Sequence, residues 1–140
     1  MRQYLVVANQ TLGGAHLLSA LQQRAAAGPC HIHVLVPAGP DPHGWSSDEA
    51  GDTAAAQRRL DAAMESMRSL GAEVSGEIGD PRPVDAVSDA LRAGSYDEII
   101  LSTLPVGVSR WLRMDLLHRL SRAVDDVPIT HIAAEHEPAP

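Results

Sequence analysis

Short hydrophobic runs alternate along the chain with segments in which hydrophobic residues recur every three or four positions. Each run has the length of a buried strand, and each periodic segment has one hydrophobic side, as an amphipathic helix requires. The alternation therefore predicts five strands separated by four helices. The predicted strands span 4–8, 31–36, 72–78, 99–101 and 127–133, and the predicted helices span 15–27, 48–70, 81–93 and 112–124.

Strands that alternate with helices pair in parallel and are joined by right-handed crossovers. The expected fold class is therefore α/β, a doubly wound five-stranded parallel sheet flanked by four helices. At 140 residues the chain has the length of a single domain, which we expect to span 1–140 with a flexible tail at 135–140. A Pro- and Gly-rich stretch at 37–47 predicts a long loop, which we interpret as a candidate lid.

Charge and composition exclude several classes of function. The net charge of −7 disfavours binding to nucleic acid, whose phosphates select basic surfaces. The eleven basic residues are all Arg, so the chain has neither a Schiff-base lysine nor a P-loop lysine. The single cysteine, Cys30, excludes an internal disulfide, which fits a cytoplasmic location. No hydrophobic run approaches the roughly 20 residues of a membrane span, so no membrane partner is expected.

Four segments of the chain carry a resemblance to a known family. They are 5–9, Gly79-Asp80-Pro81, 96–101 and 127–132. In this order and spacing they resemble the universal stress protein family, over essentially the whole chain. The resemblance implies a parallel sheet in the order 3-2-1-4-5. It also implies homodimers, often formed through the fifth strand at 127–133, and an adenine nucleotide, often ATP, as the ligand.

The sequence departs from that family in the phosphate loop of its ATP-binding members. Their loop reads glycine, two residues, glycine, nine residues, glycine and then Ser or Thr. Pro105 lacks a backbone donor, and Asp115 adds negative charge where a triphosphate would run. We therefore expect ATP to be replaced or lost as the ligand. On this chain the three glycine positions become Ser102, Pro105 and Asp115, the hydroxyl position becomes Leu116, and the carboxylate after the first strand becomes Asn9.

Polar residues follow the first and fourth predicted strands, which the implied sheet order makes neighbours. The carboxyl ends of such strands form the usual ligand crevice of a doubly wound sheet. Residues 102–122 also carry four Arg and one Asp, a local charge of +3. We therefore predict a small anionic or nucleotide-like ligand, held by hydroxyls, a helix N-terminus and Arg110. The candidate residues are Asn9, Gln10, Thr11, Ser102, Thr103, Gly107, Ser109, Arg110 and Arg113.

Other interpretations of the polar residues remain open. The same residue types are common as caps and turns, and they then close an empty cleft. Trp111 and the arginines beside it are also types enriched in protein interfaces. His31 and His33 share one face of a strand, but no Cys, Asp or Glu stands at metal-ligand spacing, so we predict no metal. Neither a nucleophile elbow nor a paired-carboxylate motif is present, and we predict no catalytic residue.

Three functional hypotheses follow from the sequence. The first is a cytoplasmic, homodimeric and non-catalytic protein that binds a small ligand or regulates a stress response. The second is a protein that hydrolyses or transfers part of a nucleotide with the loop 102–113. The third is an assembly module that pairs through 127–133 and binds no ligand. The cofactor is left open, with ATP or another adenine nucleotide as the candidate.

Overall fold

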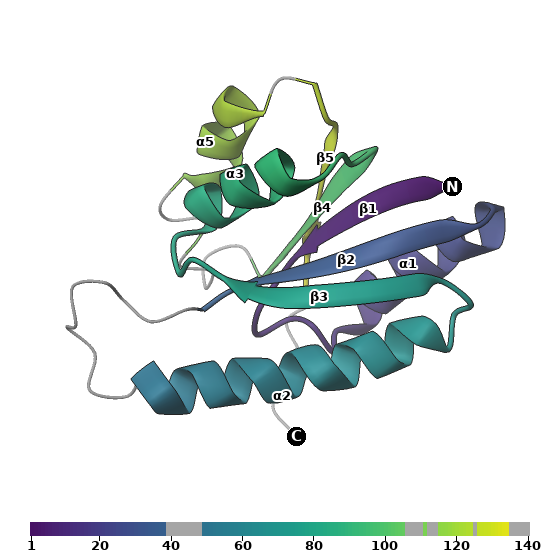
Figure 1. Cartoon of the computed structure of the whole chain (residues 1–140), viewed down its shortest axis with the longest axis horizontal. Helices are drawn as coiled ribbons and strands as arrows, with labels where there is room; N and C mark the ends of the chain where they lie inside the picture. The colour runs from purple at the N-terminus through teal and green to yellow at the C-terminus, as the bar shows by residue number, and fades with distance from the viewer. Residues whose placement is uncertain (39–48, 106–110, 112–114, 125, 135–140) are drawn as a thin grey trace.

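A five-stranded parallel sheet organises this computed structural model, in the order β3-β2-β1-β4-β5 that the family resemblance implies (Figure 1). The structure describes residues 1–38, 49–105, 111, 115–124 and 126–134. The predicted doubly wound fold is confirmed. The strands are β1 (Arg2–Val7), β2 (Cys30–Pro37), β3 (Glu73–Gly79), β4 (Glu98–Thr103) and β5 (Ile129–Ala133), and the helices are α1 (Ala15–Ala27), α2 (Glu49–Arg68), α3 (Pro83–Ala93) and α5 (Leu116–Ala123).

Helices cover both faces of the sheet. Successive side chains of a strand point to opposite faces, so one strand can contribute to the core on each side. Val6 of β1 belongs to a core shared with α1 and α2, whereas Val7 belongs to a separate core shared with α3 and α5. In Figure 1, α2 lies on one side of the sheet and α3 and α5 lie on the other. The fully buried residues of the central strands β1 and β4 supply both cores.

Strand β4 is longer than the sequence predicts. Ser102 and Thr103 were expected in the loop after the strand, but they extend it by pairing with Ile132 and Ala133 of β5. Their side chains therefore alternate between the two faces of the sheet. This alternation decides which of the two hydroxyls belongs to the candidate site.

The start of α3 also differs from the prediction. The sequence predicts a helix from Pro81 onward, but α3 begins at Pro83. Asp80 Oδ1 instead accepts the backbone N–H of Arg82 at 2.8 Å, and Arg82 is the N-cap. The predicted start is wrong by two residues, because the carboxylate closes a local turn ahead of the helix.

Several predicted features fall on residues that the structure does not describe. These are the candidate lid from residue 39 onward, the tail 135–140 and the first turn of the helix predicted at 112–124. That helix is described from Leu116 as α5. Among the described helices, none has both the length and the hydrophobicity needed to cross a membrane.

A half-buried ion pair joins α1 to the amino-terminal end of β4. Arg24 Nε and Nη2 donate to the two carboxylate oxygens of Glu98 at 2.9 and 2.7 Å. Thr130 of β5 also donates its hydroxyl to Glu98, and the Arg24 guanidinium lies 5.9 Å from the ring centroid of Tyr4. One carboxylate therefore links a helix and two strands.

We predict that this ion pair makes stability depend on pH. The hydrogen bond from Arg24 holds the pKa of Glu98 below its usual 4.5, against the opposing effect of burial. A carboxyl whose pKa is lowered by folding stabilises the protein above its unfolded pKa, and this contribution disappears as pH falls through the folded value. We expect the free energy of unfolding in urea to fall more steeply below pH 4.5 for the native protein than for Glu98→Gln. Parallel pH profiles would contradict this role.

Candidate functional site

The chain between β1 and α1 forms a tight turn that brings Thr11 beneath the start of the helix. The N–H of Leu12 donates to the carbonyl of Asn9 at 3.3 Å, and the N–H of Gly14 donates to the carbonyl of Thr11 at 2.9 Å. A Cβ atom on Gly14 would lie only 3.1 Å from that carbonyl oxygen, so glycine allows the close approach. Gly14 is the N-cap of α1 and makes no side-chain capping bond.

Thr11 and Ser102 form a buried pair of hydroxyls, although 91 residues separate them in the sequence. Their oxygen atoms lie 2.7 Å apart, and the two residues are only 6% and 2% exposed. They meet because β1 and β4 are neighbouring strands, so that their carboxyl ends share one edge of the sheet. The sequence-based expectation that these two residues come together is correct.

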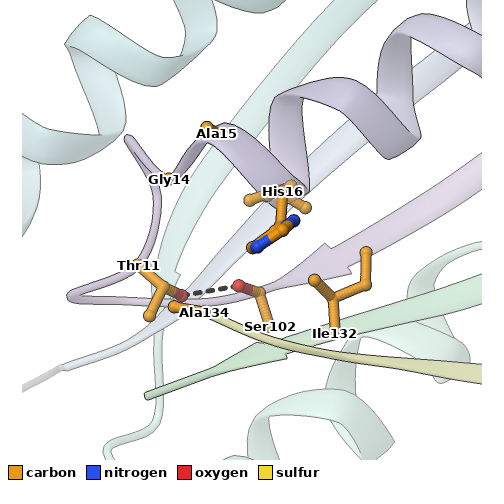
Figure 2. A pocket seen from close by; sticks show the side chains of 8 residues that line it. Thr11, Gly14, Ala15, His16, Ser102, Ile132 and Ala134 are labelled. Atoms are coloured by element: carbon orange, nitrogen blue, oxygen red, sulfur yellow. Dashed lines mark hydrogen bonds between the residues drawn. The ribbon is translucent and has the colours of Figure 1, made fainter. Parts of the chain in front are cut away.

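A pocket of about 120 Å³ opens beside this hydroxyl pair. Figure 2 shows Thr11 and Ser102 pointing toward each other, with the imidazole of His16 above Ser102 and Ile132 at the opposite side. The wall combines the first turn of α1 with the ends of β4 and β5, and none of the described residues that line it is acidic. The lining residues are Thr11, Gly14, Ala15, His16, Leu17, Ser102, Ile132 and Ala134.

Thr103 lies on the other face of the sheet and does not line the pocket. Its hydroxyl donates to the carbonyl of Leu104 at 2.9 Å and lies 2.9 Å from Nε2 of His131. Because the single hydroxyl hydrogen goes to Leu104, Nε2 of His131 must donate to Thr103. Burial lowers the pKa of His131, which favours its neutral form. Thr103 and His131 therefore fasten β5 to the end of β4.

Two other predicted residues, Asn9 and Gln10, are not among the described residues that line the pocket. Asn9 Oδ1 accepts a hydrogen bond from Arg59 of α2, and Gln10 is exposed. Their predicted role in ligand binding stays a prediction. The other predicted residues lie outside the described part of the chain, so the predicted arginine clamp stays a prediction: Gly107, Ser109, Arg110 and Arg113.

The sequence analysis missed the residues that the first turn of α1 and strand β5 bring to the pocket. His16 and Ile132 line it, yet nothing in the sequence indicates that either side chain faces a ligand site. The one usable signal was the Gly13-Gly14 pair, which marks a tight approach to a helix start. Trp111, a candidate interface residue in the sequence, is half-buried against the core of α3 and α5.

The two strand histidines share one face, as predicted, and their partners are polar side chains. His31 Nδ1 lies 2.8 Å from Oε1 of Gln3, and its Nε2 lies 2.8 Å from the hydroxyl of Ser75. His33 Nδ1 contacts the same hydroxyl at 2.7 Å. Within the described residues, no group of three or more His, Cys, Asp or Glu side chains is arranged to hold a metal ion.

Asp115 adopts a backbone conformation that glycine adopts more readily than other residues. It has φ 59° and ψ 39°, in the left-handed region, and it is the N-cap of α5. Among the described residues other than glycine, only Asp115 has a positive φ. Aspartate tolerates this region better than most residues, because its short polar side chain can hydrogen-bond locally. Aspartate at this position is therefore compatible with the start of α5 and places a carboxylate there.

Comparison with known proteins gives a clear result only for the fold. No protein-family model matches the chain, and no curated protein does either. A universal stress protein family member from Burkholderia pseudomallei has a TM-score of 0.63 at 18% identity, over 93% of this chain and 94% of that one. An AMP-bound universal stress protein family protein from Arabidopsis thaliana has a TM-score of 0.65 at 10% identity, over 96% and 93%.

The chain has the universal stress protein fold. The universal stress protein from Archaeoglobus fulgidus in complex with dAMP is similar over 94% of this chain and 98% of that one, with a TM-score of 0.60 and 18% identity. Identities this low concern the fold alone. In this universal stress protein fold, the pocket lies on the α1 side of the sheet, where strand order reverses between β1 and β4.

Proposed function

We propose that the protein is a non-catalytic, universal-stress-protein-like binder of a small nucleotide-like ligand. The ligand occupies the carboxyl edge of β1 and β4, beside Thr11 and Ser102. The protein acts through ligand occupancy rather than turnover, as a sensor or regulator associated with stress. A cytoplasmic location belongs to the same proposal.

The buried hydroxyl pair at the pocket is the observation that carries this proposal. Buried hydroxyls commonly bond to the backbone, and the half-buried Ser88 of α3 does so by donating to the carbonyl of Val84 at 2.9 Å. Thr11 and Ser102 instead bond to each other, and both line a pocket with an apolar wall formed by Leu17 and Ile132. A few polar groups in a mostly apolar hollow are typical of a ligand site.

The nature of the ligand is supported by the fold and by the departures from the ATP-binding pattern. Proteins of this fold include one solved with AMP and one solved with dAMP. Pro105 supplies no backbone N–H, and the charge of Asp115 at the start of α5 repels phosphate groups. We therefore assign a nucleoside monophosphate to this chain in preference to ATP.

Self-association through β5 completes the proposal. β5 is an edge strand of the sheet, so no described strand of the chain pairs with one side of its backbone. All five of its residues are half-buried, and its side chains are mainly apolar. An edge with these properties suits pairing with the same strand of a second copy.

Calorimetric titration of AMP, ADP and ATP into the protein tests the proposed function. We expect AMP to bind more tightly than ATP. Ser102→Ala should weaken AMP binding by about tenfold, the effect of losing one hydrogen bond to a charged group. Ser88→Ala is the matched control, because it removes a hydroxyl that bonds within α3, and its affinity for AMP should equal that of the native protein.

Two results would contradict the proposed function. One is the absence of binding by all three nucleotides to protein that is folded by circular dichroism. The other is equal AMP affinity in the Ser102→Ala and Ser88→Ala variants, which would place the ligand elsewhere. Steady release of phosphate from ATP at high protein concentration would overturn the non-catalytic assignment.

A further inference from the structure

We infer that the pocket beneath the first turn of α1 is an oxyanion site that takes a single phosphate-sized group. The inference rests on the proposed function and identifies which part of the ligand enters the pocket. It concerns the α1 side of the sheet, lined by Thr11, Ser102 and the residues that begin α1.

The pair of hydroxyls has one donor hydrogen that the bond between them does not use. Thr11 and Ser102 carry one hydroxyl hydrogen each, and the bond between their oxygens uses only one of them. The second hydrogen finds no acceptor among the residues that the structure describes. Both side chains are more than nine-tenths buried and both line the pocket, so a ligand acceptor in the pocket would satisfy this hydrogen.

The first turn of α1 adds backbone N–H donors beside the same pocket. The first N–H groups of a helix have no partner within it. Across the described residues, no acceptor is found for the N–H groups of Ala15 and Leu17. The N-cap Gly14 makes no side-chain cap, and no acidic residue stands in the first turn. None of the described residues that line this hollow is acidic, so none of them neutralises the positive end of the helix dipole.

The volume of the pocket is also consistent with a single oxyanion. A pocket of about 120 Å³ exceeds the roughly 10–15 Å³ that one water molecule needs on the same measure, but it is well below the roughly 300 Å³ at which pockets for drug-sized ligands begin. Its size suits one tetrahedral or planar oxyanion better than a whole nucleoside. The remaining part of a nucleotide would therefore lie outside the pocket.

Ala15→Pro is the variant that separates binding from folding. Proline suits the first position of a helix, where the N–H that it removes has no intrahelical partner. The preceding Gly14 has φ −69° and ψ 142°, the extended conformation that a residue before proline prefers. The variant should therefore unfold in urea at the native midpoint while lacking one donor.

Calorimetric titration with inorganic phosphate at constant ionic strength provides the test. We expect phosphate to bind the native protein, and Ala15→Pro and Ser102→Ala each to weaken it about tenfold, the effect of losing one charge-assisted hydrogen bond. A parallel titration with acetate distinguishes a phosphate site from a carboxylate site. The anion that binds more tightly identifies the chemical group that the pocket recognises. Ser88→Ala should bind phosphate as the native protein does.

The outcomes separate this inference from the proposed function. No binding of either anion, or equal phosphate binding by native protein and folded Ala15→Pro, would overturn the oxyanion site. If AMP nevertheless bound and phosphate did not compete, the proposed function would stand without it. If phosphate bound and AMP bound no more tightly, the oxyanion site would stand and the nucleotide function would fail.

Discussion

Replacing Ile100 by alanine is expected to lower the free energy of unfolding by about 2–5 kcal/mol, the range measured for truncating fully buried aliphatic side chains. Ile100 lies in the central strand β4, has no exposed surface and belongs to the core that α1 and α2 share. Neighbouring strands on both sides prevent β4 from moving into the space. Urea denaturation measures the loss as a lower midpoint at an unchanged slope.

Ile129→Ala is the matched control for this prediction. It removes the same atoms from the edge strand β5, where the side chain is only half-buried. We expect a smaller loss than for Ile100→Ala, because less apolar surface is removed from water at that position. An equal decrease in the free energy of unfolding for the two variants would contradict the deeper burial of Ile100 in the central strand.

Gly76→Val is expected to destabilise the protein by about 1–3 kcal/mol, the usual effect of overpacking. A Cβ atom at this position would lie 2.8 Å from Cδ1 of Leu60, 2.9 Å from Sδ of Met64 and 3.2 Å from the carbonyl oxygen of Val34. Valine is favoured over glycine in strands, so intrinsic propensity alone predicts the opposite sign. The sign of the change in urea denaturation therefore decides between packing and propensity.

Two further variants make the Gly76→Val result specific. Gly13→Ala adds a Cβ atom that meets nothing within 4 Å, and we expect its stability to change by less than about 0.5 kcal/mol. Leu60→Ala removes the side chain nearest to the added atoms, so its loss and that of Gly76→Val should not add. Additive losses would show that α2 does not press on β3 at this point.

The fold followed from the sequence because its strongest signals are repeated along the chain. Each central strand is an apolar run such as 4–8, and each helix carries an apolar stripe such as Leu17 and Leu21. Boundaries were less predictable where a polar side chain chose between two local partners. Asp80 closes a local turn, and the helix begins after it, at Pro83. Ser102 lies within β4, although the predicted strand ends one residue before it.

The candidate site was only partly predictable, because the face of the sheet toward which a side chain points depends on its exact position in the strand. Thr11 and Ser102 come together as expected, since both follow apolar runs that end at the same edge of the sheet. Thr103 was chosen on the same grounds, but one residue further along the strand it faces the opposite core. His16 was missed because a helix N-terminus has no sequence motif that identifies which residues line a pocket.

The most direct test of the account is an amide ¹H–¹⁵N titration of the protein with AMP. Binding beneath the first turn of α1 predicts that the largest shift changes occur at Ala15, Leu17 and Ser102, which line the pocket. The amide of Val74, on the far edge strand β3, should stay unchanged. The account would be contradicted if AMP left the three pocket amides unshifted, or if the largest changes gathered on β3.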